Sequence, residues 1–433
     1  MFTSNWRGRA AVIGTLLLTV ATALSACSSG SSGASASQGG ITGTIRVSAL
    51  TGQPYLQDAA NAFEKAHPGV HVQLVESPSN TYQTTVRAQL AANHAPDVMF
   101  VWGGSGNAMA VQELAKAELL EDLSSHPWVS KIGDTANSLV SNGGKVYALN
   151  TYENPTGVFY NKDLMNKLGV SVPKTFSDLL SWCKTVSSKG TIPIALGNQT
   201  GYLNIEVPLE IANSLSYSQD PNFGKEVSSG NFNWTNSSLW KDSLTKGLQE
   251  YMQMNDAKCF EPNSTGYSDT QANDLVSSGK ALGVDIISAA VPTVKKGNPQ
   301  LKYDMFEIPA TDNANDTYLT ANTGAAYAVN KASTNLAAAN AFIDFMGEDS
   351  QLGAASQANF GVPYAPTKDT QVQEDMQGIS SLYSAGKTAL WQTNFWPNAN
   401  VKQTMIAQDE NLILGKTDIP SVVAAVQKSM NGS

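Results

Sequence analysis

The 433-residue chain has few of the residues that build common catalytic and metal sites. It contains four histidines, all in its first third, and two of them flank Pro68-Gly69 without sharing a helical face. A metal site needs imidazoles that converge on one ion. No Gly-x-Ser-x-Gly sequence occurs, which disfavours a serine hydrolase. We therefore interpret the histidines as surface residues rather than ligands: His67, His71, His94 and His126.

Long apolar runs are absent after residue 26, so no membrane-spanning helix is expected in the rest of the chain. Before that point, Arg7 and Arg9 precede an apolar run at 10–20, which is shorter than the roughly 20 residues that cross a bilayer. This build is typical of a secretory signal peptide at 1–26. Leu24-Ser25-Ala26-Cys27 resembles a bacterial lipobox. We expect cleavage before Cys27, lipid on its sulfur, and a location at the extracytoplasmic face of the cell membrane.

Large side chains are missing from residues 28–40, which consist of Ser, Gly, Ala and one Gln. Such a segment cannot bury enough apolar surface to offset the entropy lost on ordering. We expect a flexible tether at 27–40, with a reach on the order of 20 Å.

Basic residues are fewer than acidic residues in this chain. The chain carries a net charge of −9, and loss of the two arginines in residues 1–26 would leave about −11. An acidic surface disfavours nucleic acids and anionic lipid headgroups. Apolar residues make up 42% and charged residues 15%, as in a globular protein with a substantial core. The charge of the chain therefore favours a neutral ligand over an anionic one.

Cysteine is also scarce, with three in the chain. If Cys27 carries lipid, Cys183 and Cys259 remain as an even pair in an oxidising compartment, where a disulfide is permitted. The alternative is two buried free thiols. A bridge needs a short Cα–Cα distance, which the sequence does not supply, so both possibilities stay open.

The pattern of apolar residues predicts an α/β fold. Strands are expected at 44–50, 70–74 and 96–102, with helices between them, which indicates right-handed crossovers and a mostly parallel sheet. The pattern then restarts, with helices at 162–168, from Thr175 through Cys183, and at 335–346. Further strands are expected at 145–149, 156–160, 192–196, 281–286, 303–308 and 324–329. The 393 residues after the tether suggest two lobes, with ligand at the carboxyl ends of the strands.

Several segments together resemble the maltose-binding-like carbohydrate class of solute-binding proteins of ABC importers. They include FEKAHPGVHV at 63–72, APDVMF at 95–100, FYNKDL at 159–164, PKTFSDL at 173–179 and GVP at 361–363. The resemblance also covers 114–123, 144–149 and 337–345. It implies a monomeric, two-lobed, periplasmic-binding-protein-like fold with the ligand cleft between lobes joined by hinge segments. It further implies no enzyme activity, no cofactor, and delivery of a sugar to membrane permease subunits.

By this resemblance, lobe one comprises 41–153 plus 320–366, and lobe two comprises 154–319 plus 367–433. A sugar needs flat aromatic surfaces for its ring faces and polar groups for its hydroxyls. Trp102, followed by a glycine-rich turn with Ser105, is a candidate at the end of the third strand. No Gly-Lys-Ser/Thr follows these glycines, so a phosphate loop is disfavoured.

Glu153 and Asn154 lie where the resemblance implies both a hinge and ligand contacts. A buried Glu would cost several kcal/mol unless it were hydrogen-bonded, and sugar hydroxyls supply such bonds. Ser288 stands near the position where the family carries a tryptophan, which puts one stacking contact in doubt. Trp396, in the densest aromatic group of the chain, is the leading single candidate, although the same group could pack a C-terminal helix. The remaining candidates are Tyr55, Tyr202, Asp285, Asn322 and Trp391.

Two other functions fit parts of the sequence. A peptide- or other small-solute-binding lipoprotein would share the fold, but its pocket would favour charges that pair with peptide termini. A glycosidase would need two carboxylates on either side of one bond, and Glu153 and Asp285 could supply them. A binding protein leaves its sugar intact, whereas an enzyme consumes it.

Overall fold

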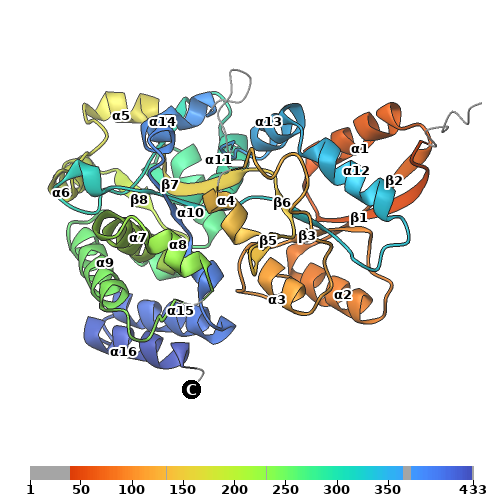
Figure 1. The fold of residues 1–433 in the computed structure, drawn as a ribbon. Coiled ribbons are helices and arrows are strands. Elements are labelled where there is room, and N and C mark those ends of the chain that lie inside the picture. The colour runs from red at the N-terminus through yellow and green to blue at the C-terminus, as the bar shows by residue number, and fades with distance from the viewer. Residues whose placement is uncertain (1–39, 133, 231, 364–371, 432–433) are drawn as a thin grey trace, which may run out of the picture. The chain divides into compact units, whose positions relative to one another are not determined.

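The computed structural model describes residues 40–132, 134–230, 232–363 and 372–431. The expected signal peptide, the tether up to residue 39 and Cys27 lie outside these described residues. Within them, none of the helices has the length and apolar character that crossing a membrane requires. Two sheets with helices on them form the α/β architecture that the sequence predicts (Figure 1).

The first sheet has the strand order β2-β1-β3-β12-β6. β1 (Gly43–Leu50) runs parallel to β2 (Val70–Ser77) and to β3 (Val98–Val101), which confirms the predicted parallel pairing of these three strands, but the remaining antiparallel pairings make the sheet mixed rather than mostly parallel. β12 (Ala326–Val329) joins β3 in the antiparallel direction and also pairs with β6 (Leu149–Asn150). Figure 1 shows α1 (Pro54–Ala66) and α12 (Leu336–Met346) above these strands, with α2 (Ser79–Ala91) and α3 (Val111–Lys116) below them. We call this part the first lobe.

Local sequence explains why α1 packs as it does. Pro54 occupies the first turn, where its missing N–H costs nothing, and Leu56 and Phe63 follow on one face. Both side chains are buried in the core of the first lobe, where the Phe63 ring meets the ring of Phe342 from α12 at 5.2 Å, edge to face. Aromatic pairs favour this geometry, so α1 and α12 are held against each other.

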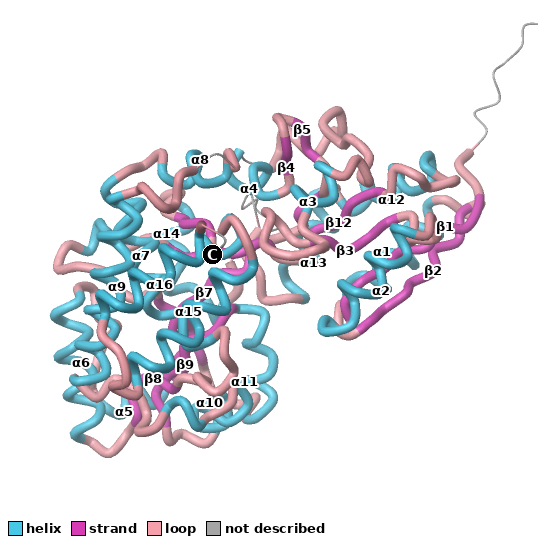
Figure 2. The backbone as a smooth tube through the Cα atoms, turned by 90° about the horizontal axis from the view of Figure 1, so that it is seen from below, coloured by secondary structure: helices cyan, strands magenta, loops and turns pink. Residues whose placement is uncertain are grey.

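The second sheet has the order β13-β11-β7-β9-β8, and β10 also pairs with β7. β7 (Glu153–Asn161) is buried at all nine residues and runs antiparallel to β11 (Leu319–Thr323), β9 (Ala281–Ile287) and β10 (Tyr303–Phe306). β8 (Ile192–Ala195) is parallel to β9, and β13 (Thr388–Leu390) is parallel to β11. This sheet and its helices form the second lobe, and Figure 2 shows its strands gathered apart from those of the first.

The helices of the second lobe are α5 (Lys162–Leu168), α6 (Phe176–Ser188), α7 (Glu206–Gln219), α8 (Phe223–Ser228), α9 (Ser238–Asp256), α10 (Asp269–Ser277), α11 (Val291–Gly297), α14 (Ser380–Ser384), α15 (Ala399–Ile413) and α16 (Ile419–Met430). The predicted start of α6 is confirmed, because the Thr175 side chain accepts a hydrogen bond from the Asp178 N–H as an N-cap. Two more helices belong to parts of the chain next to strands or helices of the first lobe. α4 (Asp134–Leu139) lies between β3 and β6 in the sequence, and α13 (Asp349–Ala358) follows α12.

The predicted strand at 145–149 is divided in the structure. β5 (Lys145–Val146) pairs with β4 (Ser141–Asn142) in a hairpin, and only β6 joins the first sheet. Gly143 and Gly144 both have positive φ values, 59° and 79°, as tight hairpin turns require. Because of this turn, residues 145–146 pair with residues 141–142 instead of joining the first sheet.

A disulfide joins Cys183 on α6 to Cys259, just after α9, with 4.7 Å between the Cα atoms. The sequence left open whether the two cysteines are bridged or free, and the structure shows the bridge. The two residues are 76 apart in sequence. A loop of this length loses unfolded-state entropy worth about 4 kcal/mol on closure, so the bridge stabilises the second lobe.

Three segments of chain pass between the sheets, at 150–153, 323–326 and 361–363, and they hydrogen-bond to one another. The Gly324 N–H donates to the Tyr152 carbonyl at 2.8 Å, and Glu153 and Val362 exchange main-chain bonds of 3.0 and 2.8 Å. A Cβ on Gly324 or on Gly361 would come within 2.3 Å of the Tyr152 ring. The ring therefore fills the space between the two glycines.

The predicted lobe boundaries stay predictions, but β11 shows where one crossing begins. Its residues pair with β7 and β13 in the second sheet, so the chain turns to the first sheet after Thr323 rather than at 320.

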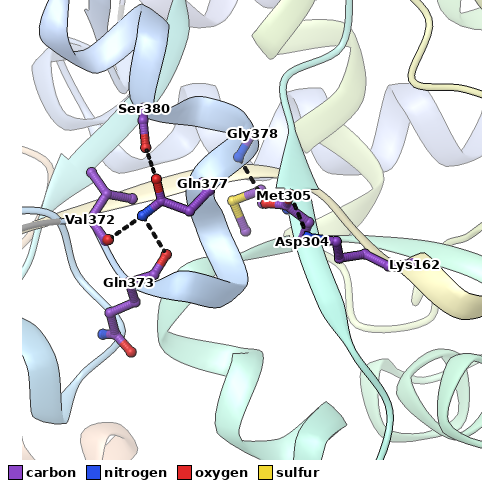
Figure 3. Close-up of polar contacts among 8 residues, drawn as sticks. All are labelled: Lys162, Asp304, Met305, Val372, Gln373, Gln377, Gly378 and Ser380. Atoms are coloured by element: carbon purple, nitrogen blue, oxygen red, sulfur yellow. Dashed lines mark hydrogen bonds and ion pairs between the residues drawn. The ribbon is translucent and has the colours of Figure 1, made fainter.

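The third segment is fixed to the second lobe after it crosses. Figure 3 shows the Asp304 carboxylate on β10 accepting hydrogen bonds from the N–H groups of Gly378 (2.8 Å) and Met305 (2.9 Å). The Lys162 ammonium lies 3.6 Å from the same carboxylate. The Gln377 amide also donates to the Val372 carbonyl. These bonds hold residues 372–379 against β10.

Candidate functional site

A row of polar groups runs from the first lobe across the second sheet. The Ser105 N–H, in the loop after β3, donates to the Asn394 carbonyl at 2.8 Å, and the Asn394 amide donates to the Asn322 side-chain oxygen at 2.6 Å. Asn322 on β11 lies opposite Asn154 on β7. The Ser288 hydroxyl donates to the Asn154 side-chain oxygen at 3.2 Å. We call these five residues the polar row.

Three of the predicted site residues, Ser105, Asn154 and Asn322, belong to the polar row. Asn394 and Ser288 complete it. The sequence does not predict either residue as a ligand contact, although it places Asn394 inside the aromatic group at 391–397. Its side-chain partner, Asn322, is 72 residues away, and no local pattern predicts that pairing.

Glu153, the first residue of β7, directly precedes Asn154, so its side chain lies on the opposite face of the strand, and the residue is 6% exposed. Burial raises the pKa of Glu153 to about 7, because a charged carboxylate is poorly solvated there. A carboxyl group poised near neutrality can accept or donate a hydrogen bond. This property suits a ligand that presents hydroxyl groups.

Asp285 on β9 is 3% exposed, and neither of its carboxyl oxygens has a hydrogen-bond partner among the described residues. Burial raises its pKa to about 7. It lies opposite Val158, and Asn154 lies four residues before Val158 on β7. Since alternate residues of a strand share a face, Asp285 lies on the face of the sheet that carries Asn154.

Three further acids face Asp285, and with it we call them the acid cluster: Glu206 and Glu210 on α7, and Glu307 just after β10. Burial, followed by the neighbouring carboxyl groups, raises the pKa of Glu210 well above its usual value. Glu307 accepts hydrogen bonds from the Ile308 and Thr320 N–H groups, and a side-chain hydrogen bond links it to Glu210.

The acid cluster does not form a metal site. Within the part of the chain that the structure describes, no group of three or more His, Cys, Asp or Glu is arranged to hold a metal ion. The Lys402 ammonium acts on the cluster and partly offsets the rise in the pKa of Glu206. Burial therefore favours the protonated form of these acids. The sequence shows Glu206 and Glu210 one helical turn apart, as in a solvent-exposed pair, so it gives no signal of their burial.

The predicted aromatic residues occupy different environments. The Trp102 indole is half-buried and meets the Phe100 ring at 4.7 Å, edge to face, whereas Tyr202 is 43% exposed beneath the Lys402 ammonium. Tyr55 lies in the core of the first lobe and Trp391 in a core of the second.

Trp396 is 1% exposed and packs against Trp240. The Trp396 ring is therefore part of the core, as expected if the aromatic group packs a C-terminal helix. Its contact with a ligand stays a prediction.

A cavity of about 610 Å³ adjoins Ser105. One wall is formed by α3 and the β4–β5 hairpin of the first lobe, and the other by α8 and the segment that follows it. Its aromatic lining residues are Phe232, Trp234 and Phe395, and buried Gln112 lies opposite them. Ligand pockets typically measure about 300–1,000 Å³, so space of a suitable size lies next to the polar row.

The fold, with two α/β lobes joined by three crossing segments and a polar row between them, defines a two-lobed binding protein. Residues 48–352 match the family model of the bacterial extracellular solute-binding proteins, and the chain belongs to this family. The predicted family is thereby confirmed, and its members act outside the cytoplasm.

Curated relatives cover most of the chain. The melibiose/raffinose/stachyose-binding protein MelE of Bacillus subtilis is 25% identical over 77% of this chain and 76% of its own length. The multiple sugar-binding protein of Streptococcus mutans is 22% identical, with 77% of each chain covered. Both are similar to this chain along most of the region beyond the tether.

Solved structures confirm the fold. The apo form of RafE from Streptococcus pneumoniae matches with a TM-score of 0.74 at 20% identity, covering 90% of this chain and 98% of RafE. A complex of RafE with raffinose matches with a TM-score of 0.72, covering 90% of this chain and 99% of that one.

Proposed function

We propose that this protein captures a sugar, most favourably an oligosaccharide, between its lobes and delivers it to the permease of an ABC importer. The polar row is the observation that carries this proposal, and Glu153, one residue before Asn154, adds a carboxyl group at the start of β7. Amide, hydroxyl and carboxyl groups at neighbouring strand ends offer both donors and acceptors, which is what several hydroxyl groups on one ligand require. The sugar-binding relatives support the same ligand class.

The chemistry of the row favours a sugar over a peptide. A peptide presents a charged ammonium and a charged carboxylate, and it is held best by fixed opposite charges. The polar row contains amides and hydroxyls only, and the neighbouring Glu153 is neutralised in part by burial. Lipid on Cys27 would keep the protein at the membrane surface, near its permease.

A thermal-shift screen of the purified chain tests this function. The panel contains raffinose, stachyose, melibiose, a maltooligosaccharide, amino acids and short peptides. A ligand at a hundred times its Kd raises the free energy of unfolding by about 2.7 kcal/mol. We expect a shift with one class of sugar and recovery of the sugar intact by chromatography. Cleaved sugar would indicate a glycosidase, and a response to peptides alone would contradict the proposed ligand class.

A further inference from the structure

The two lobes meet through bare main chain at the start of the polar row. The Ser105 N–H donates to the Asn394 carbonyl, and a Cβ on Gly104 would lie 2.2 Å from that same carbonyl oxygen. A Cβ on Gly106 would lie 3.1 Å from the Thr393 carbonyl oxygen. The glycines thus let the loop after β3 approach the 393–394 backbone with no side chain between them.

Each side of this contact is held by further main-chain hydrogen bonds. Gly104 has a φ of +76°, its N–H donates to the Leu139 carbonyl at 2.7 Å, and its carbonyl accepts from the Gln112 N–H at 3.0 Å. On the opposite side, the Asn394 N–H donates to the Trp391 carbonyl at 3.2 Å. Two supported backbones therefore meet, rather than two mobile loops.

Asn394 takes part in this contact through two different groups. Its main-chain oxygen accepts from the first lobe, while its amide donates to Asn322, which lies next to Asn154 in the second sheet. We propose that Asn394 is a positioning residue, which couples the contact between the lobes to the orientation of the Asn322 side chain in the ligand site. The role in ligand binding rests on the proposed function, whereas the contact itself does not.

Gly104→Ala tests the coupling, and Gly190→Ala is its matched control. Gly190 also has a φ of +76°, but a Cβ there meets nothing within 4 Å. Alanine therefore strains the backbone similarly at both positions, and only at 104 does it collide with Asn394. We expect hydrogen exchange at the Ser105 amide to accelerate in Gly104→Ala and not in Gly190→Ala. Affinity for the sugar found in the screen should fall about tenfold in Gly104→Ala only.

Asn394→Ala separates the two groups of Asn394. It keeps the main-chain oxygen and removes the amide, so the Ser105 amide should stay protected while sugar affinity falls about threefold to tenfold. Asn359→Ala, which removes an amide that donates to the Ala355 carbonyl, is the control and should leave affinity unchanged. Equal affinity in Asn394→Ala and wild type would overturn the proposal.

The exchange measurement needs no ligand, so it distinguishes two failures. Unchanged exchange at Ser105 in Gly104→Ala, or equal changes in Gly104→Ala and Gly190→Ala, would overturn the inferred contact. Faster exchange at Ser105 with no sugar response in wild type would leave the contact standing and contradict the proposed function. The contact is thus tested apart from the ligand class.

Discussion

At the scale of single residues, Glu153, which we propose as a ligand contact, would link sugar binding to pH. Its pKa is about 7 because burial disfavours the charged carboxylate. Sugar hydroxyls that donate to this group favour its ionised form, so binding must release the proton wherever the free carboxyl still holds it. Affinity should therefore rise as the pH increases from 5 and level off above about 7.

Glu153→Gln removes this ionisation and leaves an amide of similar shape. We expect its sugar affinity to be independent of pH between 5 and 8, and to be about tenfold weaker than wild type at pH 8. Isothermal titration at three pH values measures both quantities. Glu410→Gln, on the exposed surface of α15, should behave as wild type. A pH-dependent affinity that persists in Glu153→Gln would assign the titration to another group.

At the scale of elements, the packing of α7 on the second sheet is unusually acidic. Glu206 and Glu210 face Asp285 and Glu307, and Lys402 acts on Glu206. On α9, which also packs against α7, buried Glu250 forms its ion pair with Lys246 at 3.1 Å. Among the described residues, few cations compensate the carboxyl groups of the acid cluster, so burial favours their protonated forms.

The sign of the pH dependence follows from Glu210, which is fully buried. Burial raises its pKa well above the usual 4.5, so the folded protein keeps a proton that the unfolded chain releases as the pH rises past that value. The stabilisation is complete below about 4.5 and is lost progressively as the pH increases toward the folded-state pKa. The melting temperature should decline from pH 5 to pH 8.

Glu210→Gln should reduce that decline. A glutamine cannot ionise, so we expect the variant to match wild type at pH 5 and to exceed it by about 2 kcal/mol in free energy of unfolding at pH 8. Denaturant titrations at the two pH values measure the difference. Glu410→Gln serves again as the control. A variant that is less stable than wild type by the same amount at both pH values would show that Glu210 matters for packing alone.

At the scale of the whole molecule, the three crossing segments meet around Tyr152. Its ring separates Gly324 from Gly361, and main-chain bonds join Glu153 to Val362 beside it. Hinges absorb backbone rotation at a few residues, and glycines allow wide backbone rotation because they lack a Cβ. This arrangement connects the polar row directly to the segments that join the lobes.

Gly361→Ala tests this packing. The added Cβ would lie 2.3 Å from the Tyr152 ring, and we expect it to lower the free energy of unfolding by about 2 kcal/mol. In a Tyr152→Ala background the same substitution should cost less, because the ring is gone. A double-mutant cycle by denaturant unfolding measures this coupling. Equal costs in both backgrounds would mean that the ring is not what excludes a side chain at 361.

Local sequence was enough for much of the fold. The helix at 162–168 and the strands near 44–50, 192–196 and 281–286 lie where periodicity and capping residues predict them. The signals concerned, such as the cap at Thr175, act over three or four residues. The hairpin at 141–146 escaped prediction because its two glycines determine which partner strand 145–146 joins.

The sequence by itself determined the α/β class, the resemblance to solute-binding proteins, and Ser105, Glu153, Asn154 and Asn322 as residues worth following. Tertiary structure alone decided that Asn394 links Ser105 to Asn322, that Cys183 meets Cys259, and that Glu210 is buried against Glu307. The physical reason is distance along the chain. Apolar periodicity reports burial within one element, whereas the pairing of polar groups that lie tens to hundreds of residues apart depends on how the sheets pack.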